Sequence, residues 1–146
     1  MDRNEMKIEF GSDPRNESFA RVVVASFMTR TNPTLEEVAD VKTAVSEAVT
    51  NCIVHAYFDE NGKIEMDISD KEQIVKIEIT DHGIGIPDVK KAMEPMYTTK
   101  PEEERTGMGF SFMEAFMDEV HVYSKEGEGT KVIMTKKMGE KNHLNG

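Results

Sequence analysis

The chain has 146 residues, a length typical of one domain that can bury a sizeable core. Its 18 Lys and Arg against 28 Asp and Glu leave a formal net charge of −10, which argues against a general nucleic-acid binder and favours a basic protein partner. The single cysteine, Cys52, excludes an intramolecular disulfide, and no apolar run approaches the roughly 20 residues of a membrane span, so we expect a cytoplasmic protein without contact to membranes.

The first expected elements are a strand over Met6–Phe10, where apolar and polar residues alternate, and a helix after it. Asp13 is predicted as the N-cap of this helix and Pro14 as its first residue, because aspartate and proline favour those positions. The helix is expected to end near Arg30, and Arg21 lies off its apolar stripe, as a solvated charge would. The stripe consists of Phe19, Val22, Val23 and Phe27.

A second helix is predicted to begin at a capping box, in which Thr34 and Glu37 satisfy each other's free amides, and to run to about Tyr57. Its buried stripe is expected to contain Val38, Val41, Val45, Ala48, Val49, Cys52 and Ile53. Beside that stripe runs a polar row of Thr43, Glu47, Asn51 and His55. Residues four apart drift by only roughly 40° per step around a helix, so the row is nearly straight. This polar row could form the wall of a cleft, or it could consist of polar groups that only border the packed face of the helix.

An antiparallel hairpin is predicted next, with strands over Lys63–Ser69 and Ile74–Thr80 and a turn at residues 70–73. The alternation in the second strand continues to Asp81, which therefore falls on the buried face. A buried carboxylate is costly unless it accepts hydrogen bonds. Gly83 and Gly85 follow and permit a sharp turn or a close approach to a ligand. An ordinary strand end and a binding site both fit this stretch.

The remainder is predicted to hold a short helix over Val89–Met93, a surface loop over residues 94–106, and a helix opened by Gly107-Met108-Gly109. The last helix is expected to bury Phe110, Met113, Phe116 and Met117. A hairpin of Val120–Ser124 and Thr130–Thr135 follows. We expect one domain over residues 1–146, with a flexible polar tail from about residue 137.

The order of these motifs resembles the ATP-binding fold shared by gyrase, Hsp90, histidine kinases and MutL. In sequence the motifs are Glu47-x-x-x-Asn51, Asp81-x-Gly83-x-Gly85, Gly107-x-Gly109 and Gly129-Thr130. Within that group the amino-acid sequence resembles the anti-sigma serine kinases over nearly the whole chain. The stretches that carry this likeness are residues 16–21, 46–51, 55–57, 97–101 and 105–110. The resemblance implies an α+β two-layer sandwich, with a mixed, mostly antiparallel sheet of about five strands and helices on one face.

The resemblance also implies the roles of individual residues in binding ATP. Asp81 would accept a hydrogen bond from the adenine amino group, Thr130 would assist through water, and Gly83 and Gly85 would let the nucleotide approach. Asn51 would hold Mg²⁺ through its amide oxygen. Further ATP contacts would come from Thr98, Thr99, Lys100, Gly107 and Gly109, the two glycines through backbone amides at a helix start.

Two residues would act in catalysis by the same resemblance. Glu47 would be the general base for an attacking hydroxyl, and Arg105 would reach the terminal phosphate. Cys52 occupies a position where alanine is common in the family, and Tyr97 one where phenylalanine is common. Neither departure removes an implied catalytic group.

The implied protein is a homodimeric anti-sigma factor that binds the RNA polymerase sigma F factor, keeps it from core polymerase and so regulates sporulation transcription. It would also phosphorylate a serine of an anti-anti-sigma factor, and Arg21 would lie on the surface that both partners use. Two alternatives remain: a sibling kinase that acts on sigma B in the general stress response, and a module that binds ATP without catalysis. Glu47 disfavours the second alternative, since a module that only binds needs no base.

Overall fold

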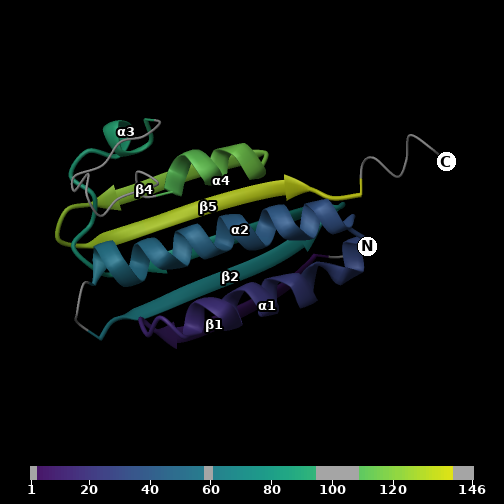
Figure 1. Ribbon diagram of the computed structural model, residues 1–146, viewed down its shortest axis with the longest axis horizontal. Coiled ribbons are helices and arrows are strands. Elements are labelled where there is room, and N and C mark those ends of the chain that lie inside the picture. The colour runs from purple at the N-terminus through teal and green to yellow at the C-terminus, as the bar shows by residue number, and fades with distance from the viewer. Residues whose placement is uncertain (1–2, 58–60, 95–108, 140–146) are drawn as a thin grey trace.

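The protein is described here by a computed structural model covering residues 3–57, 61–94 and 109–139. It forms two layers, a five-stranded sheet and a set of helices that cover one face of it (Figure 1). The strands are β1 (Asn4–Gly11), β2 (Lys63–Lys71), β3 (Ile74–Asp81), β4 (Glu119–Lys125) and β5 (Gly129–Lys137). The helices are α1 (Asn16–Met28), α2 (Leu35–Asn51), α3 (Val89–Ala92) and α4 (Phe110–Phe116).

The sheet has the strand order β1-β2-β3-β5-β4, and every neighbouring pair is antiparallel. The predicted α+β fold is therefore confirmed, with a wholly antiparallel sheet in place of a mixed one. The register aligns Asp81 at the end of β3 with Ile64 of β2 and Thr130 of β5. Within the described residues, no helix has the length and apolar character needed to cross a membrane.

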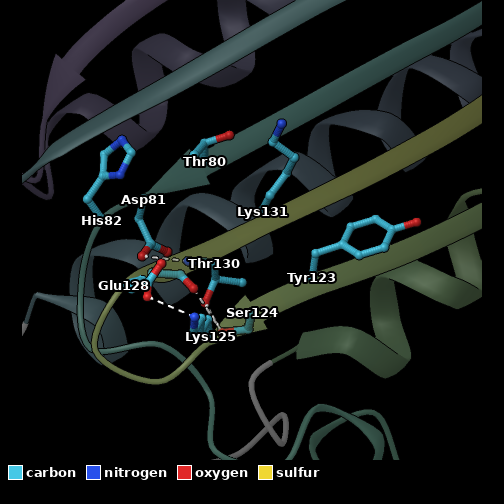
Figure 2. Close-up of a pocket in the computed structure, with 10 residues that line it drawn as sticks. Thr80, Asp81, His82, Tyr123, Ser124, Lys125, Glu128, Thr130 and Lys131 are labelled. Atoms are coloured by element: carbon cyan, nitrogen blue, oxygen red, sulfur yellow. Dashed lines mark hydrogen bonds and ion pairs between the residues drawn. The ribbon is translucent and has the colours of Figure 1, made fainter.

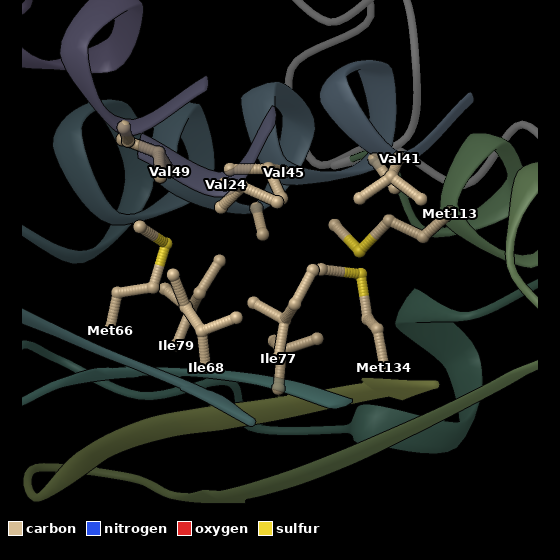
Figure 3. Close-up of a cluster of buried hydrophobic side chains, with 14 of the residues drawn as sticks. Val24, Val41, Val45, Val49, Met66, Ile68, Ile77, Ile79, Met113 and Met134 are labelled. Atoms are coloured by element: carbon tan, nitrogen blue, oxygen red, sulfur yellow. The ribbon is translucent and has the colours of Figure 1, made fainter. Parts of the chain in front are cut away.

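The core lies between the sheet and the helices, where apolar side chains of both layers meet (Figure 3). From the sheet come Met66, Ile68, Ile77, Ile79 and Met134, and from the helices come Val24, Val41, Val45, Val49 and Met113. Each of these side chains is at most 1% exposed, and full burial of such a side chain is worth roughly 1.5–3 kcal/mol. This packing determines which face of α2 turns inward.

The start of α1 differs from the prediction. The helix begins at Asn16, and its N-cap is Arg15, without a side-chain capping bond. The Asp13 carboxylate instead accepts hydrogen bonds from the backbone N–H of Arg15 at 2.8 Å and from the Arg15 guanidinium at 2.6 Å. The guanidinium lowers the pKa of Asp13 to about 2. Asp13 therefore closes a turn before the helix, and its assignment as the N-cap was wrong.

The hairpin turn between β2 and β3 is tighter than predicted, because the strands extend to Lys71 and from Ile74. Glu72 and Gln73 both adopt positive φ angles, 52° and 69°, which matches the twist of a two-residue hairpin. Neither residue is glycine, so tertiary contacts must hold the turn. Gln73 supplies them: its side-chain amide donates to the carbonyls of Thr31 at 2.8 Å and Met138 at 3.1 Å.

The predicted flexible tail begins later than residue 137. β5 continues to Lys137, and the side chain of Met138 is fully buried in the core. The backbone N–H of Gly139 donates to the carboxylate of Glu37, at 3.1 Å to Oε1. These contacts fix residues 137–139 in place, and the rest of the predicted tail lies outside the described residues.

Candidate functional site

Asp81 ends β3 on the face of the sheet that the helices cover, and only 5% of its surface is exposed. Its Oδ1 atom accepts hydrogen bonds from the backbone N–H of Gly83 at 2.9 Å and of Thr130 at 3.2 Å, the latter drawn in Figure 2. The thiol of Cys52 also hydrogen-bonds to this carboxylate. The predicted burial of Asp81 is confirmed, and the three donors offset much of its cost.

Burial still raises the pKa of Asp81, and the hydrogen bonds from Gly83, Cys52 and Thr130 oppose that rise. Burial likewise raises the pKa of the Cys52 thiol well above its usual range, because a thiolate beside the Asp81 carboxylate would be both buried and repelled. Cys52 is therefore a neutral donor to Asp81. Sequence analysis named this cysteine only as a departure from the family pattern.

A row of polar side chains continues from Asp81 across the sheet. Thr130 of β5 is 9% exposed, and its hydroxyl lies 2.8 Å from the hydroxyl of Ser124 on β4. Ser124 also donates to the carbonyl of Gly129 at 3.0 Å and accepts from the N–H of Ile86 at 2.7 Å. Sequence analysis missed Ser124. Its signal was available, because Ser124 follows Val120 and Val122 on the inward face of β4.

The glycines of this region are required by contacts within the protein itself. A Cβ on Gly83 would lie 2.4 Å from the carbonyl oxygen of Ala56, and one on Gly85 would lie 2.3 Å from that of Lys125. Gly85 also has a φ of 77° and Gly129 a φ of 116°, both unfavourable for other residues. These contacts fasten the loop after β3 to the end of α2 and to the β4–β5 turn. Contact of Gly83 and Gly85 with a nucleotide stays a prediction.

The end of the second helix differs from a regular α-helix. α2 ends at Asn51, and Cys52–Ala56 form a π-helical segment (η2) before Tyr57, where the helix was expected to end. A π-helix has more residues per turn, so His55 no longer follows straight on from Glu47 and Asn51. Segments of this kind are frequent at functional sites.

Tyr57 ties the π-helical segment to the two central strands. Its hydroxyl donates to the carbonyl of Lys63 at 2.7 Å and accepts from the backbone N–H of His82 at 2.7 Å. The end of the helix and the end of β3 are thereby held at a fixed separation. Asp81 and Asn51, thirty positions apart in the sequence, consequently belong to one region.

Glu47 and Asn51 lie on one side of α2, separated by about 6 Å along the helix axis. Both side chains are partly buried and have partners of their own. α4 packs against α2, with Phe110 and Met113 fully buried, whereas Phe116 is only half-buried. Gly109 precedes α4 with a φ of 74° and lies directly against the side chain of Glu47.

Five predicted site residues, Thr98, Thr99, Lys100, Arg105 and Gly107, lie outside the described residues. The others, apart from Arg21, fall into one region, because Gly109 touches Glu47, Cys52 next to Asn51 touches Asp81, and Asp81 accepts from Thr130. Arg21 belongs to a different surface. Its Nε lies 3.2 Å from the carboxylate of Glu17 one turn earlier on α1, and the Ser46 hydroxyl of α2 donates to that same carboxylate.

An open hollow of about 330 Å³ lies at the end of β3, β4 and β5 (Figure 2). Thr80, Lys131 and Tyr123 line it and are paired across three strands, on the face opposite to Asp81 and the helices. Asp81, Ser124 and Thr130 of the candidate site also line this hollow, so the hollow adjoins that site.

The residues present fit ATP with magnesium. Asp81 is a buried acceptor held by backbone amides, which suits recognition of an exocyclic amino group. Asn51 offers one hard oxygen ligand, and Mg²⁺ in nucleotide sites takes most of its ligands from phosphates and water. Among the described residues there is no cluster of three or more acidic, His or Cys side chains that could hold a metal ion.

Comparison with known proteins agrees with this geometry. The family model described as histidine kinase-like ATPase domain matches residues 10–136. The anti-sigma F factor of Clostridium novyi strain NT is 55% identical over 139 residues, which cover 94% of this chain and 97% of that protein. The anti-sigma F factor of Caldanaerobacter subterraneus subsp. tengcongensis is 54% identical over 136 residues, covering 93% and 95% of the two chains.

Solved structures share the fold at low sequence identity. The RsbU and RsbW domains of a Mycobacterium tuberculosis protein superpose with a TM-score of 0.63 at 14% identity, covering 92% of this chain and 32% of that one. The catalytic domain of the histidine kinase ThkA gives a TM-score of 0.58 at 19% identity, covering 91% and 96% of the two chains.

Proposed function

This chain belongs to the anti-sigma F factor family, within the histidine kinase-like ATPase domain family, and from that premise we propose that it binds sigma F and is an ATP-dependent protein serine kinase. Binding would keep sigma F from core RNA polymerase. Phosphorylation of a serine on an anti-anti-sigma factor would inactivate the protein that releases sigma F.

The observation that carries the kinase proposal is the contact region of Glu47, Gly109, Asn51 and Asp81 at one end of α2. Asp81 would accept the adenine amino group, and Asn51 would hold Mg²⁺, which neutralises charge on the phosphates. Glu47 would take the proton of the substrate serine hydroxyl while the serine oxygen bonds to the γ-phosphorus. The bond between the γ-phosphorus and the β–γ bridging oxygen would break in the same step. Arg105, Thr98 and Thr99 of the predicted surface loop would contact the terminal phosphates.

The partner proposal rests on α1. Phe19 and Val22 are 66% and 59% exposed, although apolar, and flank Arg21. An exposed apolar pair around a charged residue is typical of an interaction surface. We propose that this surface binds both sigma F and the anti-anti-sigma factor, and that the protein acts as a homodimer.

The first test replaces Glu47 with Gln, which keeps the shape of the side chain and removes the base. Phosphoryl transfer from ATP to the anti-anti-sigma serine should fall by about 100-fold or more, as expected for loss of general-base catalysis. ATP affinity should change little, because Glu47 would act on the hydroxyl and not on the nucleotide. Transfer is measured with labelled ATP, and affinity by calorimetry.

Glu36→Gln, an exposed change on the first turn of α2, is the matched control. Undiminished transfer by Glu47→Gln would show that Glu47 is not the base. If the unchanged protein captured sigma F with ATP but phosphorylated no anti-anti-sigma factor, a module that uses ATP only for gating would be favoured. Capture of sigma B in place of sigma F would favour the stress-response kinase.

A further inference from the structure

Gly109 has a structural relation to Glu47 that its predicted role in phosphate binding does not explain. An ideal Cβ built on Gly109 would lie 2.6 Å from Oε1, 2.9 Å from Cβ and 3.1 Å from Cδ of Glu47. Separations below 3.0 Å are not tolerated between such atoms. The bare Cα of Gly109 therefore forms part of the surface against which the Glu47 side chain rests.

Neither element can easily move to make room at this contact. Phe110, the next residue, is 1% exposed, and Met113 one turn later is fully buried. On the other side, Ala48 and Val49 follow Glu47 and are at most 1% exposed. Both backbones are thus anchored in a close-packed core, where added volume forces side chains from their positions. The carboxylate of Glu47, with Oε1 at 2.6 Å the nearest group, is the part that can turn away by side-chain rotation.

We propose that Gly109 is a positioning residue for Glu47: its missing side chain allows α4 to approach α2 and holds the Glu47 carboxylate in the place from which it acts. This inference rests on the proposed function, since it concerns the base of that reaction. It differs from a role in nucleotide binding, because it acts on the rate of transfer through Glu47.

A substitution at Gly109 has two effects that must be separated. With a φ of 74°, any other L-residue incurs a backbone cost, apart from the clash with Glu47. Gly127 provides the matched control, because its φ is 84° and a Cβ there would meet nothing within 4 Å. Gly127→Ala carries the backbone cost alone.

The experiment measures kcat for anti-anti-sigma phosphorylation and the Kd of ATP in Gly109→Ala, Gly127→Ala, Glu47→Gln and the double variant Gly109→Ala with Glu47→Gln. We expect Gly109→Ala to lower kcat by about 10- to 100-fold, as misplacing a catalytic group by about 1 Å does, with a small change in Kd. Gly127→Ala should leave kcat nearly unchanged. In the Glu47→Gln background, Gly109→Ala should have almost no further effect, because the group that it displaces no longer acts.

Several outcomes would overturn the proposal. If Gly109→Ala lowered kcat equally in both backgrounds, or raised the Kd of ATP with kcat unchanged, Gly109 would serve the nucleotide and not Glu47. A normal kcat in Glu47→Gln itself would instead refute the proposed function. Should Gly109→Ala fold poorly, Gly109→Asn provides the second variant: asparagine tolerates positive φ, yet its Cβ meets Glu47 in the same way.

Discussion

At the scale of single residues, Asp81 shows how a costly group becomes a usable one. An unpaired buried carboxylate would destabilise the fold, but two backbone amides and the Cys52 thiol hydrogen-bond to this one. Its donors come from three separate segments of the chain. Removal of the Asp81 carboxylate would leave the backbone amides of Gly83 and Thr130 without this acceptor. The same side chain therefore has a role in the fold and a proposed role in adenine binding.

The raised pKa of Asp81 predicts a pH dependence of nucleotide binding. The ionised carboxylate is a stronger acceptor for the adenine amino group than the protonated one, so ADP affinity should fall as pH decreases through the raised pKa, at a higher pH than for an ordinary aspartate. Calorimetric titration with ADP from neutral to mildly acidic pH would measure this. Asp81→Asn, which keeps Cys52, Tyr57 and His82, should bind weakly and without the same pH dependence; an identical profile would contradict the assignment.

The raised pKa of Asp81 also predicts how the stability of the fold changes with pH. Because the folded state holds the Asp81 proton more tightly than the unfolded state, this group's contribution to folding falls as pH rises from its usual value of 3.8 through the raised pKa, and stays lower above it. Urea unfolding should therefore show a smaller loss of stability over that interval in Asp81→Asn than in the unchanged protein.

At the scale of elements, α2 is fastened at both ends by different means. At its start, the capping box is present as predicted: the Thr34 side chain accepts from the N–H of Glu37 at 3.0 Å, and Glu37 accepts from the N–H of Thr34 at 2.9 Å. Glu37 is only 8% exposed and also accepts from Gly139 after β5. At its other end, Cys52 and Tyr57 attach it to the strand that carries Asp81.

The shared role of Glu37 predicts an order of stabilities. Thr34→Ala should cost about 1 kcal/mol, as loss of an N-cap does, whereas Glu37→Ala should cost about 2–4 kcal/mol, because it leaves the N–H groups of Thr34 and Gly139 unpaired. Denaturant unfolding measures both. Glu36→Ala, an exposed neighbour in the same turn, should change stability by about 0.5 kcal/mol or less. Equal costs for Thr34→Ala and Glu37→Ala would mean that the contact with Gly139 contributes nothing.

At the scale of the whole molecule, the proposed partner surface and the candidate nucleotide site lie on different elements. Arg21 is on α1, which packs beside α2 over the β1–β2 side of the sheet, whereas α4 lies over the β5–β4 side (Figure 1). The net charge of −10 fits a basic partner, and steering by such a charge weakens as salt is added.

This separation predicts that Arg21→Glu will weaken capture of both sigma F and the anti-anti-sigma factor while ATP affinity is retained. The substitution reverses a charge on the proposed surface and removes the ion pair with Glu17. Pull-down with each partner and calorimetry with ATP would test it. Arg15→Glu, an exposed change before α1, serves as the control for charge alone. Normal capture by Arg21→Glu would exclude this surface.

The sequence by itself determined most of the elements, and it indicated the residues for which binding or catalytic roles are proposed. Periodicity identified five strands and the main helices, since alternation and helical spacing reflect which face is buried. The capping box and the burial of Asp81 were likewise readable, because both depend on neighbours within a few positions. Family resemblance supplied the roles proposed for Glu47 and Asn51, which spacing alone left open.

Only the tertiary structure decided what those residues touch. The contacts of Asp81 with Cys52, of Gly139 with Glu37 and of Gly109 with Glu47 join segments far apart in the chain, and no local pattern encodes such pairs. The π-helical turn after Asn51 and the positive φ angles of Glu72 and Gln73 are imposed by packing against local preference. Asp13, a good N-cap by composition, instead pairs with Arg15 two positions later, which is a local contact that the capping pattern did not predict.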